Sequence, residues 1–156
     1  MFPKPSADLI ELLQFLNAHK VRYLLVGGLA VMYYTEPRFT KDSDVLVSPD
    51  KENAEKVFRA LAAFGAPLEG ITAQDFAEEG VFFQMGRAPM QIDIITSIQA
   101  IDFEEAWERR VQTTWDDLPV NILSREDLIR NKEAVAREQD MIDVKFLKAT
   151  RRGDNV

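Results

Sequence analysis

Two stretches of the chain decide its fold: Tyr23-Leu24-Leu25-Val26-Gly27-Gly28 and Thr40-Lys41-Asp42-Ser43-Asp44-Val45-Leu46-Val47. The four apolar residues before the glycine pair predict a short buried strand, and the glycines open a helix over 29–34 that Pro37 ends. The second stretch predicts another buried strand over 43–47, because its apolar residues form a short run bounded by polar ones. A strand, a glycine turn, a helix and a second strand in this order predict an α/β arrangement.

Amphipathic helices flank these two strands. One begins near Ser6 or Asp8, and the other follows the helix-start signal Ser48-Pro49-Asp50. In both, apolar residues recur at i, i+3, i+4 and i+7, as Leu9, Leu12, Leu13 and Leu16 in the first and as Ala54, Val57, Phe58 and Leu61 in the second.

The rest of the chain adds strands and helices without strict alternation. We expect an irregular region over 65–80, a hairpin of strands 81–85 and 90–95, a helix from Phe103 to about Val111, an edge strand over 119–123, a helix from Ser124 and a final helix over 139–149. The hairpin argues against a purely parallel sheet. The sequence therefore predicts a single α/β (α+β) domain over residues 1–156, with a mixed β-sheet flanked by helices and with helices at its C-terminal end.

The composition limits the chemistry that the chain can perform. Its 156 residues include 19 Lys and Arg against 26 Asp and Glu, and the net charge of −7 predicts no general attraction to nucleic acid or anionic membranes. The chain has no cysteine and one histidine, so a metal would need oxygen ligands, which favours Mg²⁺ or Mn²⁺. It has no apolar run of the roughly 18 residues that cross a bilayer and no secretion signal, so we expect a cytoplasmic protein without a membrane partner.

Three aspartates are the candidate metal ligands. Asp42 and Asp44 alternate along one strand, so their side chains point to the same face. Asp93 lies in a second apolar strand, where a carboxylate is costly to bury without a cation. A shared divalent ion would stabilise all three, although each could instead pair with an arginine or cap a turn. An Asp-x-Asp pattern alone is weak evidence, so the buried setting is what favours a metal site.

Gly27-Gly28 is the candidate phosphate-binding turn. Glycines at the start of a helix let a phosphate approach backbone N–H groups at the positive end of the helix dipole. The pair matches neither G-x-G-x-x-G nor the P-loop pattern, so it does not indicate a Rossmann or Walker site. Taken alone, such a pair is more often a tight turn.

Together these residues resemble the nucleotidyltransferase superfamily, which shares the catalytic fold of DNA polymerase β. The resemblance rests on Val26-Gly27-Gly28-Leu29-Ala30 and on Pro37-Arg38-Phe39-Thr40-Lys41-Asp42-Ser43-Asp44-Val45. The superfamily pattern is a Gly-Gly or Gly-Ser pair at a helix start, then Arg-x-Thr, Asp-x-Asp and a later third Asp. The resemblance implies catalytic metal ligands at Asp42, Asp44 and Asp93 and nucleotide-binding residues at Gly27, Gly28, Arg38 and Thr40, with Lys41 as a further candidate.

The C-terminal part extends this resemblance to the AbiEii-like abortive-infection toxins. Asn131-Lys132, Arg137 and Asp140-Met141-Ile142-Asp143 look like the lysine and aspartate motifs of that branch. Lys132 lies on an apolar helical face, so it would bind an anion such as a nucleotide phosphate or else extend to solvent. Asp140 and Asp143 could orient Lys132 or Arg137, or could form a solvated face.

These observations predict a metal-dependent nucleotidyltransferase that moves a nucleoside monophosphate from an NTP to a hydroxyl group. Asp42 and Asp44 would hold the ion on the triphosphate, and Asp93 would complete a second site and act as general base. The acceptor stays open between RNA such as tRNA, a protein and a small molecule, and the toxin resemblance adds a cognate antitoxin as a partner. The alternatives are a non-catalytic nucleotide- or metal-binding module of the same fold and an interaction domain whose acids are ordinary surface groups.

Overall fold

A six-stranded sheet forms the centre of the computed structural model, which describes residues 5–38, 40, 42–87 and 90–150. The strand order is β3-β4-β2-β1-β6-β5. The strands are β1 (Tyr23–Val26), β2 (Asp42–Val47), β3 (Phe82–Arg87), β4 (Met90–Ile95), β5 (Val111–Trp115) and β6 (Leu118–Ile122).

The sheet is mixed, which confirms the predicted fold class. Central strand β2 runs antiparallel to β1 and parallel to β4, and β1 also runs parallel to β6. The β3–β4 and β5–β6 hairpins form the two outer parts of the sheet. The predicted hairpin of β3 and β4 is therefore confirmed, while residues 88–89 between these strands lie outside the described part of the chain. Strand β1 and the second half of β2, Val45 to Val47, are apolar and buried because both strands have neighbours on both sides.

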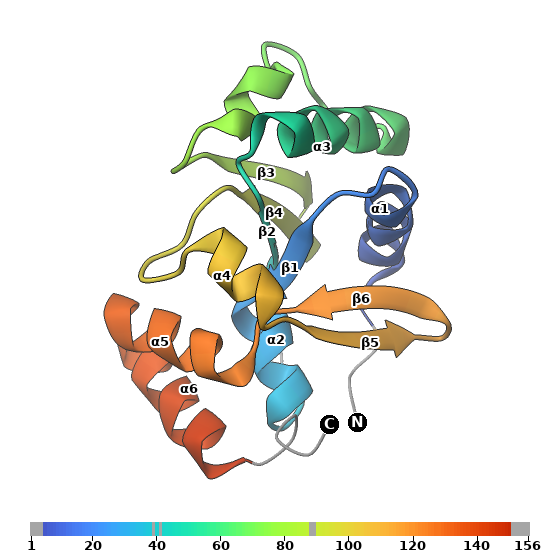
Figure 1. Ribbon diagram of the computed structural model, residues 1–156. Helices are drawn as coiled ribbons and strands as arrows, with labels where there is room; N and C mark the ends of the chain where they lie inside the picture. The colour runs from blue at the N-terminus through green and yellow to red at the C-terminus, as the bar shows by residue number, and fades with distance from the viewer. Residues whose placement is uncertain (1–4, 39, 41, 88–89, 151–156) are drawn as a thin grey trace.

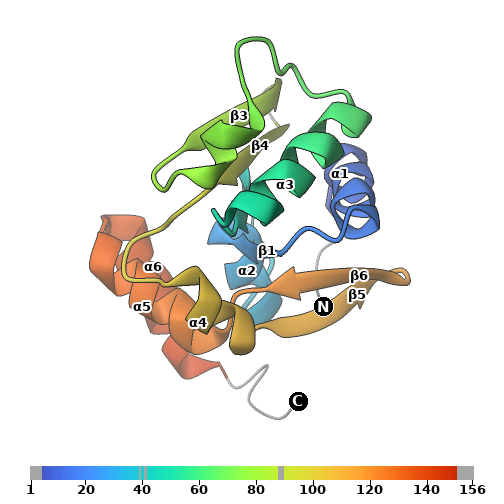
Figure 2. The ribbon, with the colours of Figure 1, turned by 45° about the horizontal axis from the view of Figure 1, so that its top comes forward.

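Six α-helices and one 3₁₀ helix surround the sheet. Helices α1 and α3 pack on each other, and α5 packs on α6 at the other side of β1 and β2, with α2 against both β1 and β2 (Figures 1 and 2). None of the helices in the described residues has the length and apolar character of a membrane span. The helices are α1 (Ala7–Ala18), α2 (Gly27–Tyr34), α3 (Lys51–Phe64), η1 (Ala73–Ala77), α4 (Phe103–Glu108), α5 (Arg125–Val135) and α6 (Glu138–Ala149).

Side-chain caps fix three of the helix starts that the sequence predicted. Ser6 accepts a hydrogen bond from the N–H of Leu9, and Asp50 accepts one from the N–H of Asn53. Ser124 caps α5 in the same way. Such caps satisfy N–H groups that the helix itself leaves without a partner.

Two predictions about the segment after Phe103 are wrong. The helix there does not reach Val111 but ends at Glu108, and Val111 begins β5. The strand near Pro119 is β6, which is not an edge strand, because β5 pairs along its outer side. The hairpin between them turns at Asp116 and Asp117, with φ angles of 45° and 71°. A glycine usually marks such a left-handed turn, and its absence hid the hairpin from sequence analysis. The region expected to be irregular also contains the short 3₁₀ helix η1, which was not predicted.

The turn supplies a test of this account. We expect Asp117→Gly to raise the free energy of unfolding by roughly 0.5–1 kcal/mol, because glycine adopts φ of 71° without the steric cost of a side chain. Urea denaturation measures the change. The same substitution at Asp50, where φ is −56° and the side chain caps α3, should bring no gain. Equal effects at the two positions would contradict the turn assignment.

Candidate active site

One cleft of about 760 Å³ brings most of the predicted site residues together. Strands β2 and β4 supply its aspartates, the start of α2 supplies its glycines, and α5 and the residues around the start of α6 supply cations. Asp143 is not part of the lining, and Lys41 lies outside the described residues. The predicted residues that line the cleft are Gly27, Gly28, Arg38, Thr40, Asp42, Asp44, Asp93, Lys132, Arg137 and Asp140.

The three aspartates lie on neighbouring strands and face one volume. Strands β2 and β4 pair in parallel, with Asp44 opposite Asp93. Alternation along β2 puts Asp42 on the same face as Asp44. Burial, followed by a hydrogen bond with Asp93 and the negative charges of Asp93 and Asp42, raises the pKa of Asp44 to about 7. Burial and the neighbouring negative charges thus both disfavour the ionised form of Asp44.

Unpartnered oxygens show how a cation would fit this cluster. Oδ1 of Asp42 and Oδ1 of Asp93 are buried and have no hydrogen-bond partner. A buried carboxylate oxygen is costly unless a donor or a cation reaches it. In the part of the chain that the structure describes, no three His, Asp or Glu side chains are placed so that they could already hold a metal ion. The oxygen donors nevertheless fit a hard divalent ion, because such an ion would relieve both the repulsion and the missing partners.

The glycine pair makes room for two side chains of the site. Gly27 has a φ of +65°, and a Cβ atom on it would lie 2.3 Å from Oδ2 of Asp44. A Cβ atom on Gly28 would lie 2.9 Å from Oγ1 of Thr40. Helix α2 has no side-chain cap at its start, so its first N–H groups are open to an anion. The two glycines are therefore also needed because Asp44 and Thr40 approach them closely, which the sequence did not reveal.

Two buried carboxylates of α6 hold the cations of the cleft. Nζ of Lys132 lies 3.2 Å from Oδ1 of Asp140 and 3.2 Å from Oδ2 of Asp143. Because the Lys132 side chain is only 9% exposed, it does not extend to solvent. Nε of Arg137 donates to Asp140 at 2.8 Å, and Arg38 donates to both oxygens of Asp143. Asp140 and Asp143 are therefore the centre of an ion-pair cluster and not a solvated face.

The cations keep these two carboxylates ionised. Burial acts to raise the pKa of Asp143, but hydrogen bonds from Arg38 and Gln139 and the charge of Lys132 bring that pKa below its ordinary value. Burial also opposes the shift at Asp140, whose pKa is lowered by hydrogen bonds from Arg137 and Lys132. The cleft thus has Asp44 on the sheet side, whose pKa is raised, and Asp140 on the helix side, whose pKa is lowered, with Asp143 behind the lining.

Sequence analysis missed several uncharged residues of the cleft. Phe82 and Gln84 of β3 line it, as does Gln139 of α6. Gln84 stands opposite Asp93 in the β3–β4 register, and residues that are opposite across a pair of strands share a face. Alternation around Asp93 in the predicted hairpin could therefore have revealed Phe82 and Gln84. Nothing in the sequence pattern pointed to Gln139.

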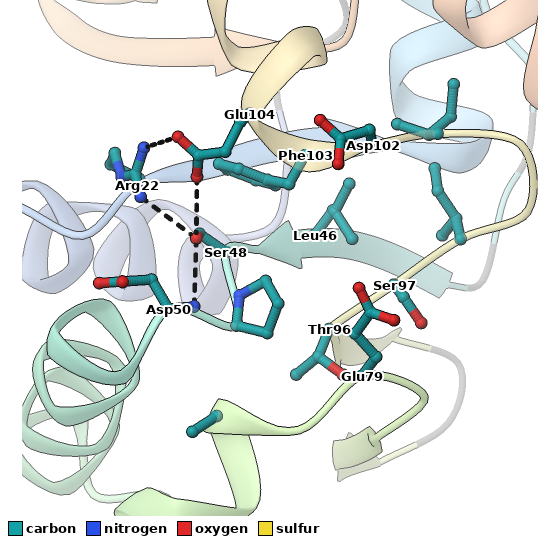
Figure 3. Close-up of a pocket in the computed structure, with 14 residues that line it drawn as sticks. Arg22, Leu46, Ser48, Asp50, Glu79, Thr96, Ser97, Asp102, Phe103 and Glu104 are labelled. Atoms are coloured by element: carbon teal, nitrogen blue, oxygen red, sulfur yellow. Dashed lines mark hydrogen bonds and ion pairs between the residues drawn. The ribbon is translucent and has the colours of Figure 1, made fainter.

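A second cavity, of about 480 Å³, lies beside the cleft and shares Ile98 with it. In Figure 3, Glu104 reaches both Arg22 and Ser48. Arg22 donates to Glu104 at 2.7 Å and to Oγ of Ser48 at 3.3 Å, and Ser48 in turn accepts from the N–H of Asp50. These groups join α4 to β1, β2 and the start of α3, and none of the predicted site residues in the described chain lines this cavity.

A family model described as a nucleotidyltransferase of unknown function, DUF6036, matches residues 7–151. The chain belongs to this nucleotidyltransferase family. The predicted resemblance to nucleotidyltransferases is thereby confirmed, whereas the match does not single out the abortive-infection branch. No curated protein matches the chain in sequence.

Solved nucleotidyltransferase structures have a fold similar to that of this DUF6036 member. The lincosamide antibiotic adenylyltransferase LnuA, with lincomycin bound, has a TM-score of 0.60 at 19% identity, over 94% of this chain and 99% of that one. The antibiotic-resistance factor ANT(2'')-Ia has a TM-score of 0.62 at 14% identity, over 91% and 81%. An antigenic nucleotidyltransferase-like protein from Paracoccidioides brasiliensis has a TM-score of 0.53 at 14% identity, over 92% and 77%. At these identities the likeness concerns the fold.

The raised pKa of Asp44, about 7 against 3.8 in the unfolded chain, predicts how stability depends on pH without divalent ions. The folded protein retains a proton that the unfolded chain releases, so the free energy of unfolding should fall as pH rises from about 4 to about 7. The steepest loss is on the order of 1 kcal/mol per pH unit. Urea denaturation in EDTA measures it. Asp44→Asn removes the titrating group and should flatten this part of the profile; an unchanged slope would show that the proton is bound elsewhere.

Gly27→Ala tests the contact with Asp44. The new Cβ atom would meet Oδ2 of Asp44 at 2.3 Å and adopt a φ of +65°, so we expect a loss of roughly 2–4 kcal/mol in the free energy of unfolding. Gly70→Ala is the matched control, because Gly70 has a φ of +75° with open space around it. The control should lose only about 1 kcal/mol, the backbone part of the cost. Equal losses at Gly27 and Gly70 would show that Asp44 does not need the glycine.

Proposed function

We propose that this protein transfers a nucleoside monophosphate from an NTP to a hydroxyl group of a small molecule. The proposal depends on one observation: three aspartates of adjacent strands, two with unpartnered buried oxygens, share a cleft with the uncapped start of α2. Membership of a nucleotidyltransferase family supports the reaction class.

The triphosphate would bind where the cleft offers N–H groups and cations. The first N–H groups of α2 are open, and the glycines let an anion come close to them. Arg38 and Lys132 line the same cleft, and Thr40 adds a hydroxyl group. These groups would hold the phosphate chain beside Asp42 and Asp44 and so orient the α-phosphorus.

The aspartates would hold the divalent ion that this reaction class requires. Asp42, Asp44 and Asp93 fit Mg²⁺ or Mn²⁺ by donor type, because all three are carboxylates. When bound, such an ion neutralises charge that develops on the phosphate oxygens and lowers the pKa of a nearby hydroxyl group. The pKa of Asp44, which burial and the nearby carboxylates raise, would then be lowered by the positive charge.

The chemical step is a displacement at the α-phosphorus. The acceptor oxygen forms a bond to that phosphorus, while the bond from it to the oxygen bridging the α- and β-phosphorus breaks. Pyrophosphate leaves with the electron pair of the broken bond, and the proton of the acceptor hydroxyl passes to Asp93 as general base. On β4, Asp93 lies opposite Gln84, and β2 separates β4 from β1 and the glycines that follow it. The acceptor would therefore bind at the β4 side of the cleft, beside Asp93.

The charge of the cleft favours a small acceptor over RNA. Its described lining contains three cations and four aspartates, and two of the cations, Lys132 and Arg137, are bound to Asp140. A polyanionic strand would need free positive charge along its phosphates. Among the similar structures, LnuA has lincomycin bound and ANT(2'')-Ia is in complex with adenylyl-2''-tobramycin, and both ligands are small molecules. Roles in a toxin–antitoxin pair and in the cytoplasm stay predictions from sequence.

Label transfer tests the proposed reaction. The protein is incubated with each NTP labelled at the α-phosphate, with Mg²⁺ or Mn²⁺, and with separate RNA, protein and small-molecule fractions of a cell extract. We expect transfer to a small molecule, and a loss of at least about a hundredfold in Asp42→Ala/Asp44→Ala.

The control is Glu52→Ala/Glu55→Ala, which removes two exposed carboxylates of α3 and changes the net charge equally. It should transfer label at the wild-type rate. Transfer that persists unchanged in the double aspartate variant would refute the assignment. Binding of NTP without transfer to any fraction would instead support the non-catalytic module, and transfer to RNA or protein would overturn the choice of acceptor.

A further inference from the structure

Asp143 of α6 binds more groups of the site than any pattern in the sequence suggested. It accepts hydrogen bonds from Nη1 and Nη2 of Arg38 and, at 3.0 Å, from Nε2 of Gln139. Nζ of Lys132 lies 3.2 Å from Oδ2 of Asp143. The Asp143 side chain is only 2% exposed, so these contacts are made away from solvent. The sequence predicted Lys132 or Arg137 as the partner of the α6 aspartates, and the pairing with Arg38 is new.

Arg38 lies where it can reach the phosphate-binding turn. Nη2 of Arg38 is 3.5 Å from the position that a Cβ atom on Gly28 would occupy. Arg38 follows the end of α2 and belongs to no helix or strand, so its backbone does not fix its side chain. An unrestrained arginine side chain loses rotamer entropy when it binds a phosphate, and this loss weakens binding. A partner that restrains it beforehand removes that cost.

The carboxylate stands behind the cations and not between them and the cleft. Arg38 and Lys132 both line the cleft, whereas Asp143, which contacts both, does not. An aspartate that competed with phosphate would be expected in the lining itself. The arrangement therefore resembles a support for two cations that both line the cleft.

We propose that Asp143 is a positioning residue for nucleotide binding, which holds Arg38 over Gly28, so that α6 completes the triphosphate site. This inference rests on the proposed function. Asp143 would act through Arg38 and would not itself contact the nucleotide.

A double-mutant cycle tests the proposal. The probes are α,β-methylene analogues of the four NTPs with Mg²⁺, which cannot be cleaved at the reacting bond, and calorimetry measures their dissociation constants. We expect Asp143→Asn to weaken binding about tenfold in the wild-type protein. In the Arg38→Ala background the same substitution should change binding by less than about twofold, because the residue through which it acts is gone.

Two further variants keep the result interpretable. Glu138→Gln makes the same chemical change at an exposed position of α6 and should leave binding unchanged. Asp143→Glu keeps the charge beside Lys132 while moving the carboxylate, and it replaces Asp143→Asn in the cycle if the latter does not fold, as judged by thermal unfolding. It should weaken binding in the wild-type background only.

The outcomes separate this inference from the proposed function. Binding by the wild type, together with a loss that disappears in Arg38→Ala, supports the positioning role. If the wild type binds but the Asp143 substitution leaves affinity unchanged, increases it, or weakens it equally in both backgrounds, the positioning role is overturned and the proposed function is not. A wild-type protein that binds none of the four analogues overturns both.

Discussion

The close pairing of Asp44 with Asp93 across parallel strands β2 and β4 is the constraint on which the rest of the site depends. Two carboxylates placed side by side in a partly buried position repel each other and lose hydration. The raised pKa of Asp44 expresses that cost, and the charge of Lys132 is a component that opposes it. Gly27 belongs to the same arrangement, because its missing side chain is what lets Asp44 lie against the start of α2.

Helices α5 and α6 form the side of the cleft that faces strands β2 and β4. The sheet supplies negative charge, and α5 and α6 bring Lys132 and the carboxylates that hold it. The family model matches residues 7–151 and so includes both helices. This extent covers the strands that carry the three aspartates as well as the helices that carry Lys132, Asp140 and Asp143. Fold and site are therefore coupled, since α5 and α6 pack on each other and α2 contacts both.

The sequence indicated the strands and helices that carry the site, but few of the contacts between their side chains. Periodicity identified the buried strands and most helices, because burial of one face imposes a repeat that is visible in the residue order. It failed over 111–115, where residues alternate between partly buried and exposed up to Trp115 and the following turn has aspartates in place of glycine. The meeting of Asp42 and Asp44 with Asp93 depends on the pairing of β2 with β4, but the shared face of Asp42 and Asp44 could be predicted, because alternation fixes the face of a strand. Their position relative to Gly27 could not, since it depends on how β1 pairs with β2.

By itself, the sequence determined the secondary structure around the glycine pair, the strands that carry the acids and the resemblance to nucleotidyltransferases. These features are local, because each depends on residues that lie close together in the sequence. Only the tertiary structure decided that Asp143 pairs with Arg38, 105 residues away, and that Lys132 lies buried between two aspartates. No local pattern encodes such pairs, because packing of the C-terminal helices against the sheet is what brings them within hydrogen-bonding distance.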